Sequence, residues 1–513
     1  MIGILINNFL GKTPRWYKLT ILTFLVINPI VFFFISPFVA GWMLLLEFIF
    51  TLALALKCYP VPSGGLLALQ AVIIGLTSSK KVYYEVATNL PVLLLIIFMV
   101  AAVFYLKDVV FLAFTKLIIG IRNKQSLCLT FCMLCAFLAA FLDALAIMAA
   151  IVAVCFNCYA IYHRVAAELA DSENGQAEME EFKGFMRNFI MHGAVGAIMG
   201  GNLTIVGVPH NLMIADRLDW TFGCFVQNVA LVAIPVIIVG FVLCVILETV
   251  KFPGYGYKLP ERAYDAIVKD YNSKFAQLNK QSLFEYALQT ITAVLLFFAL
   301  AFHLAEVGLI GVALMVIIAA FHGKIKEHDY AEAFNHAMPF TLLIMVFFAV
   351  LAVVDDQHLV KPVIDWAFTF DGKTQLLALF FSNGALSMVS DNIFVASIFI
   401  NEVEAAYKQG AFGALECGAV EGVALHCKCT AEAALGCSAR TAREWFETLG
   451  VAVSMGTNIP TMGTPNGHAA LLFLLTSSLA PLINLSYLQM FRLTLPYTIV
   501  LTTTGALCVY FLM

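Results

Sequence analysis

The sequence predicts an all-α polytopic membrane protein. Of its 513 residues, 62% are hydrophobic and only 12% are charged, whereas a soluble domain carries about 25% charged residues. Apolar runs long enough to cross a bilayer core of roughly 30 Å as helices recur along the whole chain. An internal repeat, described below, predicts an inverted-topology repeat with about 11 transmembrane helices and two re-entrant hairpins.

The first half contains apolar runs, interrupted at defined places. Leu106–Lys124 has charges and a short apolar core, which favours a helix lying at the membrane interface. Leu127–Ala160 is a longer apolar stretch with one charge, Asp143, in its middle. A polar, acidic segment then leads to a broken helix at about 188–215. The predicted spans of this half lie near 18–35, 38–57, 64–79, 89–106 and 222–247.

The second half repeats this order after the polar segment 250–283. Asp355–Lys373 is a second candidate interfacial segment, and Gln375–Val403 is a second apolar stretch, with Asp391 as its central acid. A second broken helix is predicted at about 448–480. The spans of this half lie near 285–302, 305–321, 336–354 and 491–512.

The two broken segments also resemble each other in sequence. GGNLTIVGVPHN begins at Gly200, and GTNIPTMGTPNG begins at Gly456. Laid without gaps, Gly200, Asn202, Gly207 and Pro209 meet Gly456, Asn458, Gly463 and Pro465. We therefore predict three parts: a first repeat, 1–249, with a hairpin at 127–160; a cytoplasmic linker, 250–283; and a second repeat, 284–513, with a hairpin at 375–403.

Lys and Arg residues predict the orientation, because loops rich in them stay in the cytoplasm. Lys12, Arg15 and Lys18 place the N-terminus there, as do six basic residues for the segment 251–280. The topology closes if the first hairpin enters from the cytoplasm and the second from outside. Two halves of opposite topology are typical of secondary transporters.

Glycine and proline break the chain within the membrane, where an unpaired backbone group costs several kcal/mol. Such a break is tolerated where it lines a cavity inside the protein, because freed carbonyls and polar side chains then face inward. Half-helix ends add partial charge. The breaks therefore predict an ion site near the midplane. The alternative is two Gly/Pro-rich loops between short spans.

Asp143 and Asp391 are the candidate ion-carrying acids. An Asp at the centre of a span costs roughly 2.5–3.5 kcal/mol, so two at matching positions suggest a function. An ionised carboxylate binds a hard cation together with neutral oxygens, and protonation ends that binding, so one residue can exchange sodium for a proton. The alternative is an Asp that caps a hairpin tip. The candidate ion- and proton-binding residues are Asp143, Asp391, Ser390, Asn392, Asn202, Thr204, Thr457, Asn458, Thr461, Thr464 and Asn466.

Other features give weaker predictions. His210 and His468 lie in or beside the breaks and are candidates for pH sensing. The stretch from His426 to Cys429, HCKC, fits no metal-ligand spacing when taken with Cys437. The chain has no H-E-x-x-H, G-x-S-x-G or P-loop motif, so we expect neither an enzyme nor a cofactor.

Long motifs along the chain carry a family resemblance. NNFLGKTPRWYKL, AFLDALA, FHLAEVGLIG, SDNIFVASIFINE and TPNGHAALLFLLTSSLAPL are among them. On these, the chain resembles NhaB-type sodium/proton antiporters of bacterial inner membranes, within the ion transporter superfamily. The resemblance implies exchange of cytoplasmic Na⁺ for external H⁺ and a homodimer with a scaffold and a moving transport domain. One segment departs from it: Gly410–Arg440 is longer than the family's link and rich in cysteine.

Three classes of function compete. The antiporter is the leading hypothesis, with Li⁺ as a second candidate cargo and electrogenic exchange expected from the pair of acids. A sodium-coupled carrier of a small carboxylate or oxyanion is the alternative. An acid at both hairpin tips and the absence of arginine from both breaks disfavour an anion. An ion channel would not need two halves of opposite topology.

Overall fold

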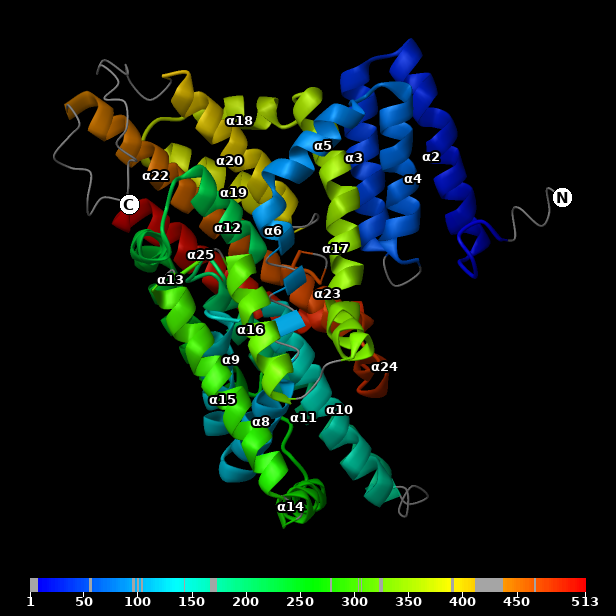
Figure 1. Cartoon of the computed structure of the whole chain (residues 1–513), viewed down its shortest axis with the longest axis vertical. Helices are drawn as coiled ribbons and strands as arrows, with labels where there is room; N and C mark the ends of the chain where they lie inside the picture. The colour runs from blue at the N-terminus through cyan, green and yellow to red at the C-terminus, as the bar shows by residue number, and fades with distance from the viewer. Residues whose placement is uncertain are drawn as a thin grey trace.

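The computed structural model describes residues 8–513 except for short gaps and one long one. Within the described part every regular element is a helix, which confirms the all-α class (Figure 1). The residues outside the description are 1–7, 55–57, 95–96, 99–100, 103–104, 143, 167–172, 277–278, 303, 306, 323–325, 389–391, 411–436 and 466.

The N-terminal helices form a bundle on one side of the molecule (Figure 1). α2 (Arg15–Phe34), α3 (Pro37–Ala53) and α4 (Pro60–Ile74) pack on one another, and α3 and α4 also pack on the long helix α17 (Glu327–Asp356). Inside the bundle, the buried Asn28 amide donates to the Glu47 carboxylate at 2.7 Å. This pairing gives each of two buried polar side chains one partner, which reduces their cost inside a membrane.

The centre of the molecule is built from two groups of helices. The first group comprises α9 (Lys124–Ala139), α10 (Ala144–Ala166), α11 (Glu173–Gly201), α12 (Pro209–Arg217) and α13 (Phe222–Val250). The second comprises α19 (Lys373–Ser387), α20 (Asn392–Lys408), α22 (Cys437–Asn458), the 3₁₀ turn η3 (Pro460–Gly463), α23 (Ala469–Thr476) and α25 (Tyr487–Leu512). α9 and α10 extend toward one end of the long axis, and α19 and α20 toward the other (Figure 1).

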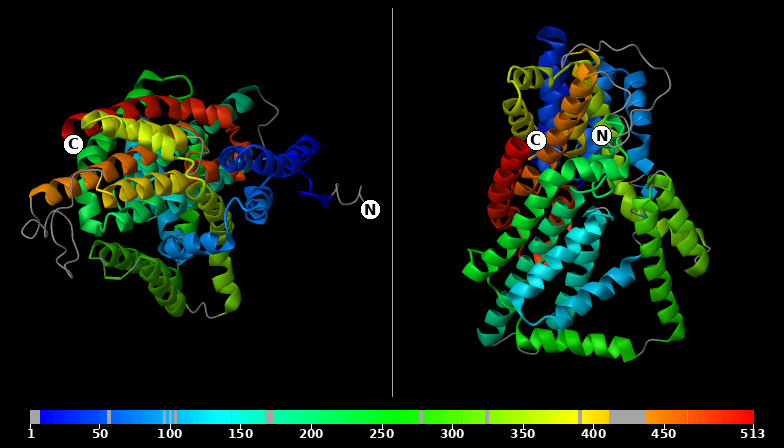
Figure 2. Two further views of the ribbon diagram at one scale, coloured as in Figure 1. Left: turned by 90° about the horizontal axis from the view of Figure 1, so that it is seen from above. Right: turned by 90° about the vertical axis from the view of Figure 1, so that its left-hand side faces the viewer.

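The remaining helices lie at the periphery and at the ends. α14 (Glu261–Ala276) lies across one end of the molecule, and α18 (Lys361–Phe368) lies near the other (Figures 1 and 2). α14 falls inside the predicted linker 250–283, which is therefore partly helical. These helices are α5 (Ser79–Thr88), α6 (Leu90–Leu94), α8 (Lys107–Gly120), α14 (Glu261–Ala276), α15 (Lys280–Ala301), α16 (Val307–His322), α18 (Lys361–Phe368) and α24 (Leu479–Leu482).

Small residues let the central helices approach closely. A Cβ atom added at Gly200 of α11 would lie 1.9 Å from the carbonyl oxygen of Ala136 in α9. A Cβ at Gly456 of α22 would lie 2.6 Å from the carbonyl oxygen of Phe380 in α19. Close backbone packing at glycine is a common way to join helices in a membrane, and here it fixes each broken helix against a hairpin helix.

The helices have the length and exposure of a multi-pass membrane protein. Among the described residues, five helices are long and apolar enough to span, or six if α17 and α18, bent by 60°, count as one span. Four shorter apolar helices accompany them. Large apolar side chains face outward, with Phe34 83% and Ile73 82% exposed, which suits contact with lipid and not with water. The count of about 11 spans and the re-entrant hairpins remain predictions.

Most predicted spans coincide with helices, and one differs. The predicted span 89–106 contains the five-residue helix α6 and only partly described residues after it. Within 188–215 the helix is interrupted, because α11 ends at Gly201 and α12 begins at Pro209. Within 448–480, α22 ends at Asn458 and α23 begins at Ala469.

Candidate functional site

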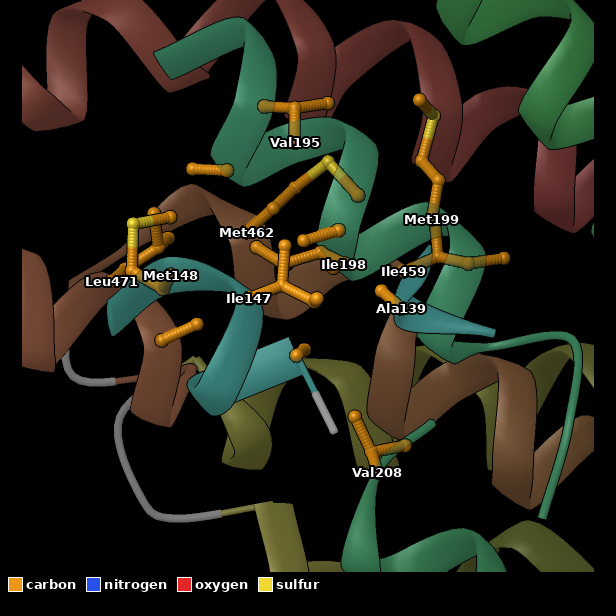
Figure 3. Packing of buried hydrophobic residues seen from close by; sticks show 14 of the residues in the cluster. Ala139, Ile147, Met148, Val195, Ile198, Met199, Val208, Ile459, Met462 and Leu471 are labelled. Atoms are coloured by element: carbon orange, nitrogen blue, oxygen red, sulfur yellow. The ribbon is translucent and has the colours of Figure 1, made fainter. Parts of the chain in front are cut away.

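The two helix breaks meet in the middle of the molecule. Their polar side chains are buried, including Asn202, Thr204, Asn458 and Thr461. An apolar shell surrounds them, and Figure 3 shows residues of α10, α11, η3 and α23 packed together there, including Ile147, Ile198, Met462 and Leu471. The breaks are therefore closed off from lipid, as irregular backbone inside a membrane must be.

A line of hydrogen bonds joins the first break to the second. His210 Nε2 lies 2.7 Å from Asn458 Oδ1. The Asn458 amide donates to Asn211 Oδ1 at 3.0 Å, and the Ser454 hydroxyl donates to the same oxygen at 3.4 Å. Asn211 follows the first break and Asn458 precedes the second, so these contacts hold the two half-helices face to face.

Asn211 also ties the backbone of the first break. Its amide donates to the carbonyl oxygen of Gly201 at 3.1 Å and to that of Thr204 at 2.9 Å. Both carbonyls belong to the end of α11 and the turn after it, where the helical partner is missing. Asn211 thus fixes the conformation of the break.

A threonine in each break contacts the neighbouring hairpin helix in the same way. Thr204 Oγ1 donates to the Ala140 carbonyl and accepts from the Gly207 amide at 3.2 Å. Thr464 Oγ1 donates to the Met388 carbonyl and accepts from the Gly467 amide at 3.0 Å. Ala140 and Met388 each stand three positions before a predicted acid, Asp143 or Asp391. The two hairpins therefore meet the two breaks through one shared arrangement.

These contacts show which residues of the two halves of the chain are equivalent, and the equivalence differs from the ungapped sequence alignment. Thr204 corresponds to Thr464, because the two make matching hydrogen bonds. By their close contacts with the hairpin helices, Gly196 corresponds to Gly456 and Gly200 corresponds to Pro460. The register is shifted by four residues, about one helical turn. Asn202 and Asn458 are therefore not structural equivalents, although the sequence pattern aligns them.

Polar side chains of the second break face the helices of the second hairpin. The Asn383 amide donates to Thr457 Oγ1 at 2.8 Å and to the Val453 carbonyl at 2.7 Å. The Asn392 amide lies 3.5 Å from Thr461 Oγ1, at the long end of a hydrogen bond. Seven predicted residues are thus in or beside the two breaks, all with neutral oxygens: Asn202, Thr204, Asn392, Thr457, Asn458, Thr461 and Thr464.

Of the nine buried side-chain polar atoms that have no hydrogen-bond partner within the described residues, three lie in or beside the breaks. They are Asn202 Oδ1, Asn392 Oδ1 and His468 Nε2. An amide oxygen without a donor is costly when buried, and it is also a ligand that a hard cation accepts. The Oδ1 atoms of Asn202 and Asn392 are therefore buried oxygens with the chemistry of a cation ligand.

Four predicted site residues lie outside the described residues: Asp143, Ser390, Asp391 and Asn466. Their described neighbours are informative, because the Ala144 amide donates to the Gly207 carbonyl at 3.1 Å. The Met388 carbonyl, on the other side, accepts from Thr464. The chain beside each acid thus contacts a break. The roles of both acids remain predictions, as does sodium binding by them.

The two candidate pH-sensing histidines are buried. His210 pairs with Asn458 as described, and His468 Nδ1 caps α23 by accepting from the Ala470 amide at 3.3 Å. Neither ring contacts bulk water, being 2% and 4% exposed. Their role in sensing pH remains a prediction.

A known protein family matches this chain from end to end. The family model described as Bacterial Na⁺/H⁺ antiporter B (NhaB) matches residues 1–427 and 420–513. The chain belongs to the NhaB family. It is 46% identical to the Na⁺/H⁺ antiporter NhaB of Shewanella denitrificans, covering 98% of this chain and 92% of the relative. The identity is 46% to that of Vibrio atlanticus, over 98% and 91%, and 45% to that of Yersinia enterocolitica, over 99% and 93%.

Sequence reasoning missed part of the site. Asn211, Asn383, Ser387 and Ser454 all join its hydrogen bonds. A signal was present, because Asn383 and Ser387 stand one turn apart on an apolar helix, as do Ser454 and Asn458. Polar residues at that spacing share one helix face, and here that face points at the breaks.

A second buried polar cluster lies away from the breaks. Glu248 Oε1 lies 2.9 Å from His192 Nε2, and Glu248 Oε2 lies 2.5 Å from Lys124 Nζ. The other His192 nitrogen is 2.8 Å from the Tyr497 hydroxyl. Cys128, His192 and Glu248 place ligand atoms within 4.8 Å of one another. Because Glu248 already pairs with both Lys124 and His192, and His192 with Tyr497, we interpret the cluster as an ion-pair network and not as a metal centre.

Proposed function

We propose that this protein is a secondary active transporter that exchanges sodium for protons. The observation that carries the proposal is its membership of the NhaB family, with about 45% identity to named Na⁺/H⁺ antiporters over nearly the full length. The geometry of the breaks supports it independently. They supply buried neutral oxygens beside two hairpin tips, which is the ligand set a sodium site needs.

The proposed cycle uses the same site in turn for both ions. With Asp143 and Asp391 ionised, Na⁺ binds between a carboxylate and amide, hydroxyl or carbonyl oxygens of the breaks. Protonation removes the negative charge, and the hydrated cation then becomes the more stable state. Because the cycle uses only reversible Na⁺ coordination and reversible protonation of a carboxylate, it needs no enzyme chemistry and no cofactor beyond the transported ions.

We place the protein in a bacterial inner membrane, as an inverted repeat with a cytoplasmic N-terminus, and expect a homodimer. The shared contacts of Thr204 and Thr464, and the positions of the hairpin helices toward opposite ends of the molecule, support the repeat. The basic residues of the N-terminus and of 251–280 support the orientation. The homodimer rests on the family resemblance alone.

The proposal is tested in everted membrane vesicles that hold an acid interior. Adding NaCl should collapse the pH gradient when the protein is present, and LiCl tests the second cargo. Asp391→Asn should keep the fold, because the amide is close in shape to the acid, yet abolish sodium-dependent proton release. Exchange as fast as that of the unmodified protein would remove Asp391 from the mechanism.

Electrogenic exchange is tested with purified protein in right-side-out proteoliposomes without a pH gradient. Two acids can carry two protons while the site holds one sodium ion, so net positive charge would move inward. An inside-negative potential should then drive Na⁺ out, since each charge gains roughly 2.3 kcal/mol per 100 mV. Efflux that ignores the potential indicates one-for-one exchange. Sodium-driven uptake of a labelled carboxylate, without proton exchange, would favour the anion carrier instead.

A further inference from the structure

A cavity of about 480 Å³ opens at the end of the molecule where α14 lies. It lies between the C-terminal ends of α8 and α13, the first turn of α9 and the beginning of α14. The helix breaks are not part of it. Its lining combines four cationic side chains with two acidic ones: Arg122, Lys124, Lys251, Lys258, Glu248 and Glu261.

The cations are not equally available for a ligand. Lys124 is held by Glu248 at 2.5 Å, and that carboxylate also accepts from the Gly256 amide at 3.2 Å. Arg122, Lys251 and Lys258 are exposed and have no ion pair within the described part of the chain. One acid of the lining is thus already neutralised, and three cations remain against Glu261.

Arg122 is positioned and not merely present. Its guanidinium lies 4.2 Å from the centre of the Tyr264 ring, and the Tyr264 hydroxyl donates to the Ile119 carbonyl at 2.9 Å. A guanidinium stacked on a ring keeps its N–H fork free at the edge, where it can bind two oxygens of one phosphate. The positive end of the α14 dipole lies beside the same cavity and adds to its attraction for an anion.

Part of the cavity wall is apolar. Ile118, Leu127 and Phe185 are buried, and Leu259 lies beside them in the lining. A free phosphate ion has no use for such a wall, whereas a phospholipid brings glycerol and acyl carbons with its phosphate. The proposed orientation places this end at the cytoplasmic leaflet, where basic pockets between membrane helices suit anionic lipids.

We infer that this cavity binds the phosphate head group of an anionic phospholipid. Arg122 holds the phosphate through its fork, Lys251 and Lys258 supply the balancing charge, and the apolar wall receives the lipid's glycerol and first carbons. The site is separate from the ion-exchange site at the helix breaks.

The test is lipid retention by the purified full-length chain. The protein in detergent is given equal amounts of phosphatidylglycerol and phosphatidylcholine, and native mass spectrometry counts the lipid that remains bound. The unmodified chain should retain phosphatidylglycerol in preference. Arg122→Gln and Lys258→Gln should each weaken retention by about tenfold, the effect of losing one hydrogen bond to a charged group, and Arg122→Lys should lose less because its charge remains.

Lys269→Gln is the matched control, because Lys269 is an exposed cation on α14 outside the cavity lining. It should retain phosphatidylglycerol as the unmodified chain does. Circular dichroism and the exchange rate in vesicles check that each variant is folded. Equal retention of both lipids, or an equal loss in Lys269→Gln, would overturn the inference. Displacement of phosphatidylglycerol by millimolar inorganic phosphate would assign the cavity to free phosphate and overturn the lipid assignment.

Discussion

At the scale of single residues, the site depends on side chains that pair with backbone. Asn211 contacts two carbonyls of the first break and also joins Asn458 and Ser454. Polar residues in the breaks could be named from the sequence because Gly, Pro and Asn are rare in apolar runs. Their partners could not, since a hydrogen bond between Asn211 and Asn458 joins residues far apart in the chain.

Replacing Asn211 by Leu should destabilise the protein, mainly through lost hydrogen bonds and not through a change in core volume. The carbonyls of Gly201 and Thr204 and the amide of Asn458 would each lose a buried partner, at about 1–3 kcal/mol for each unsatisfied group. We expect a clear fall in the midpoint of thermal unfolding and a loss of exchange. Asn272→Ala, at an exposed position of α14, is the control. A variant with an unchanged midpoint would contradict this account of the break.

At the scale of elements, hydropathy located most helices but not how they pair. The apolar spans and both breaks were predictable, because the length of an apolar run and its Gly and Pro content are local properties of the sequence. The register between the halves was not, since the ungapped alignment matched Gly200 with Gly456 whereas the close contacts match Gly196 with Gly456. A shift of one turn leaves the helix face unchanged, so the pattern alone cannot detect it.

Gly200→Ala should separate α11 from α9. The added carbon would lie 1.9 Å from the Ala136 carbonyl oxygen, a backbone atom that cannot turn aside. Overpacking of this kind costs about 1–3 kcal/mol, and the displaced break should lower the sodium-dependent exchange rate as well. Gly223→Ala is the control in α13, because nothing lies within 4 Å of its added carbon. It should be neutral or stabilising by about 1 kcal/mol, and equal losses in both variants would argue against the close-packing explanation.

At the scale of the whole molecule, the two ends differ in their polar features and in the pair of hairpin helices that extends toward each. α14 and the cationic cavity mark one end, whereas α18 and the contact of Lys81 with Asp355 lie at the other. The all-α membrane class could be predicted from composition, whereas the number of membrane spans could not. Short helices such as α4 and α16 are apolar but too short to span the membrane alone, so packing against other helices decides how deep in the membrane they lie.

The topology follows from this difference between the ends and is open to direct measurement. A cysteine replacing Lys269 in α14 should react with a membrane-impermeant maleimide only from the cytoplasmic side, and one replacing Phe370, after α18, only from outside. Cys417, Cys427 and Cys429, which lie outside the described residues, are replaced by serine. The resulting chain is both the background of the two variants and the baseline for label uptake, since the eight free cysteines of the described residues are all buried. If the two positions react from the same side, α14 and α18 share one face of the membrane. The two hairpins would then enter the membrane from the same side. That result would contradict the inverted repeat and the alternating access that it permits, although the contacts at the two breaks would still stand.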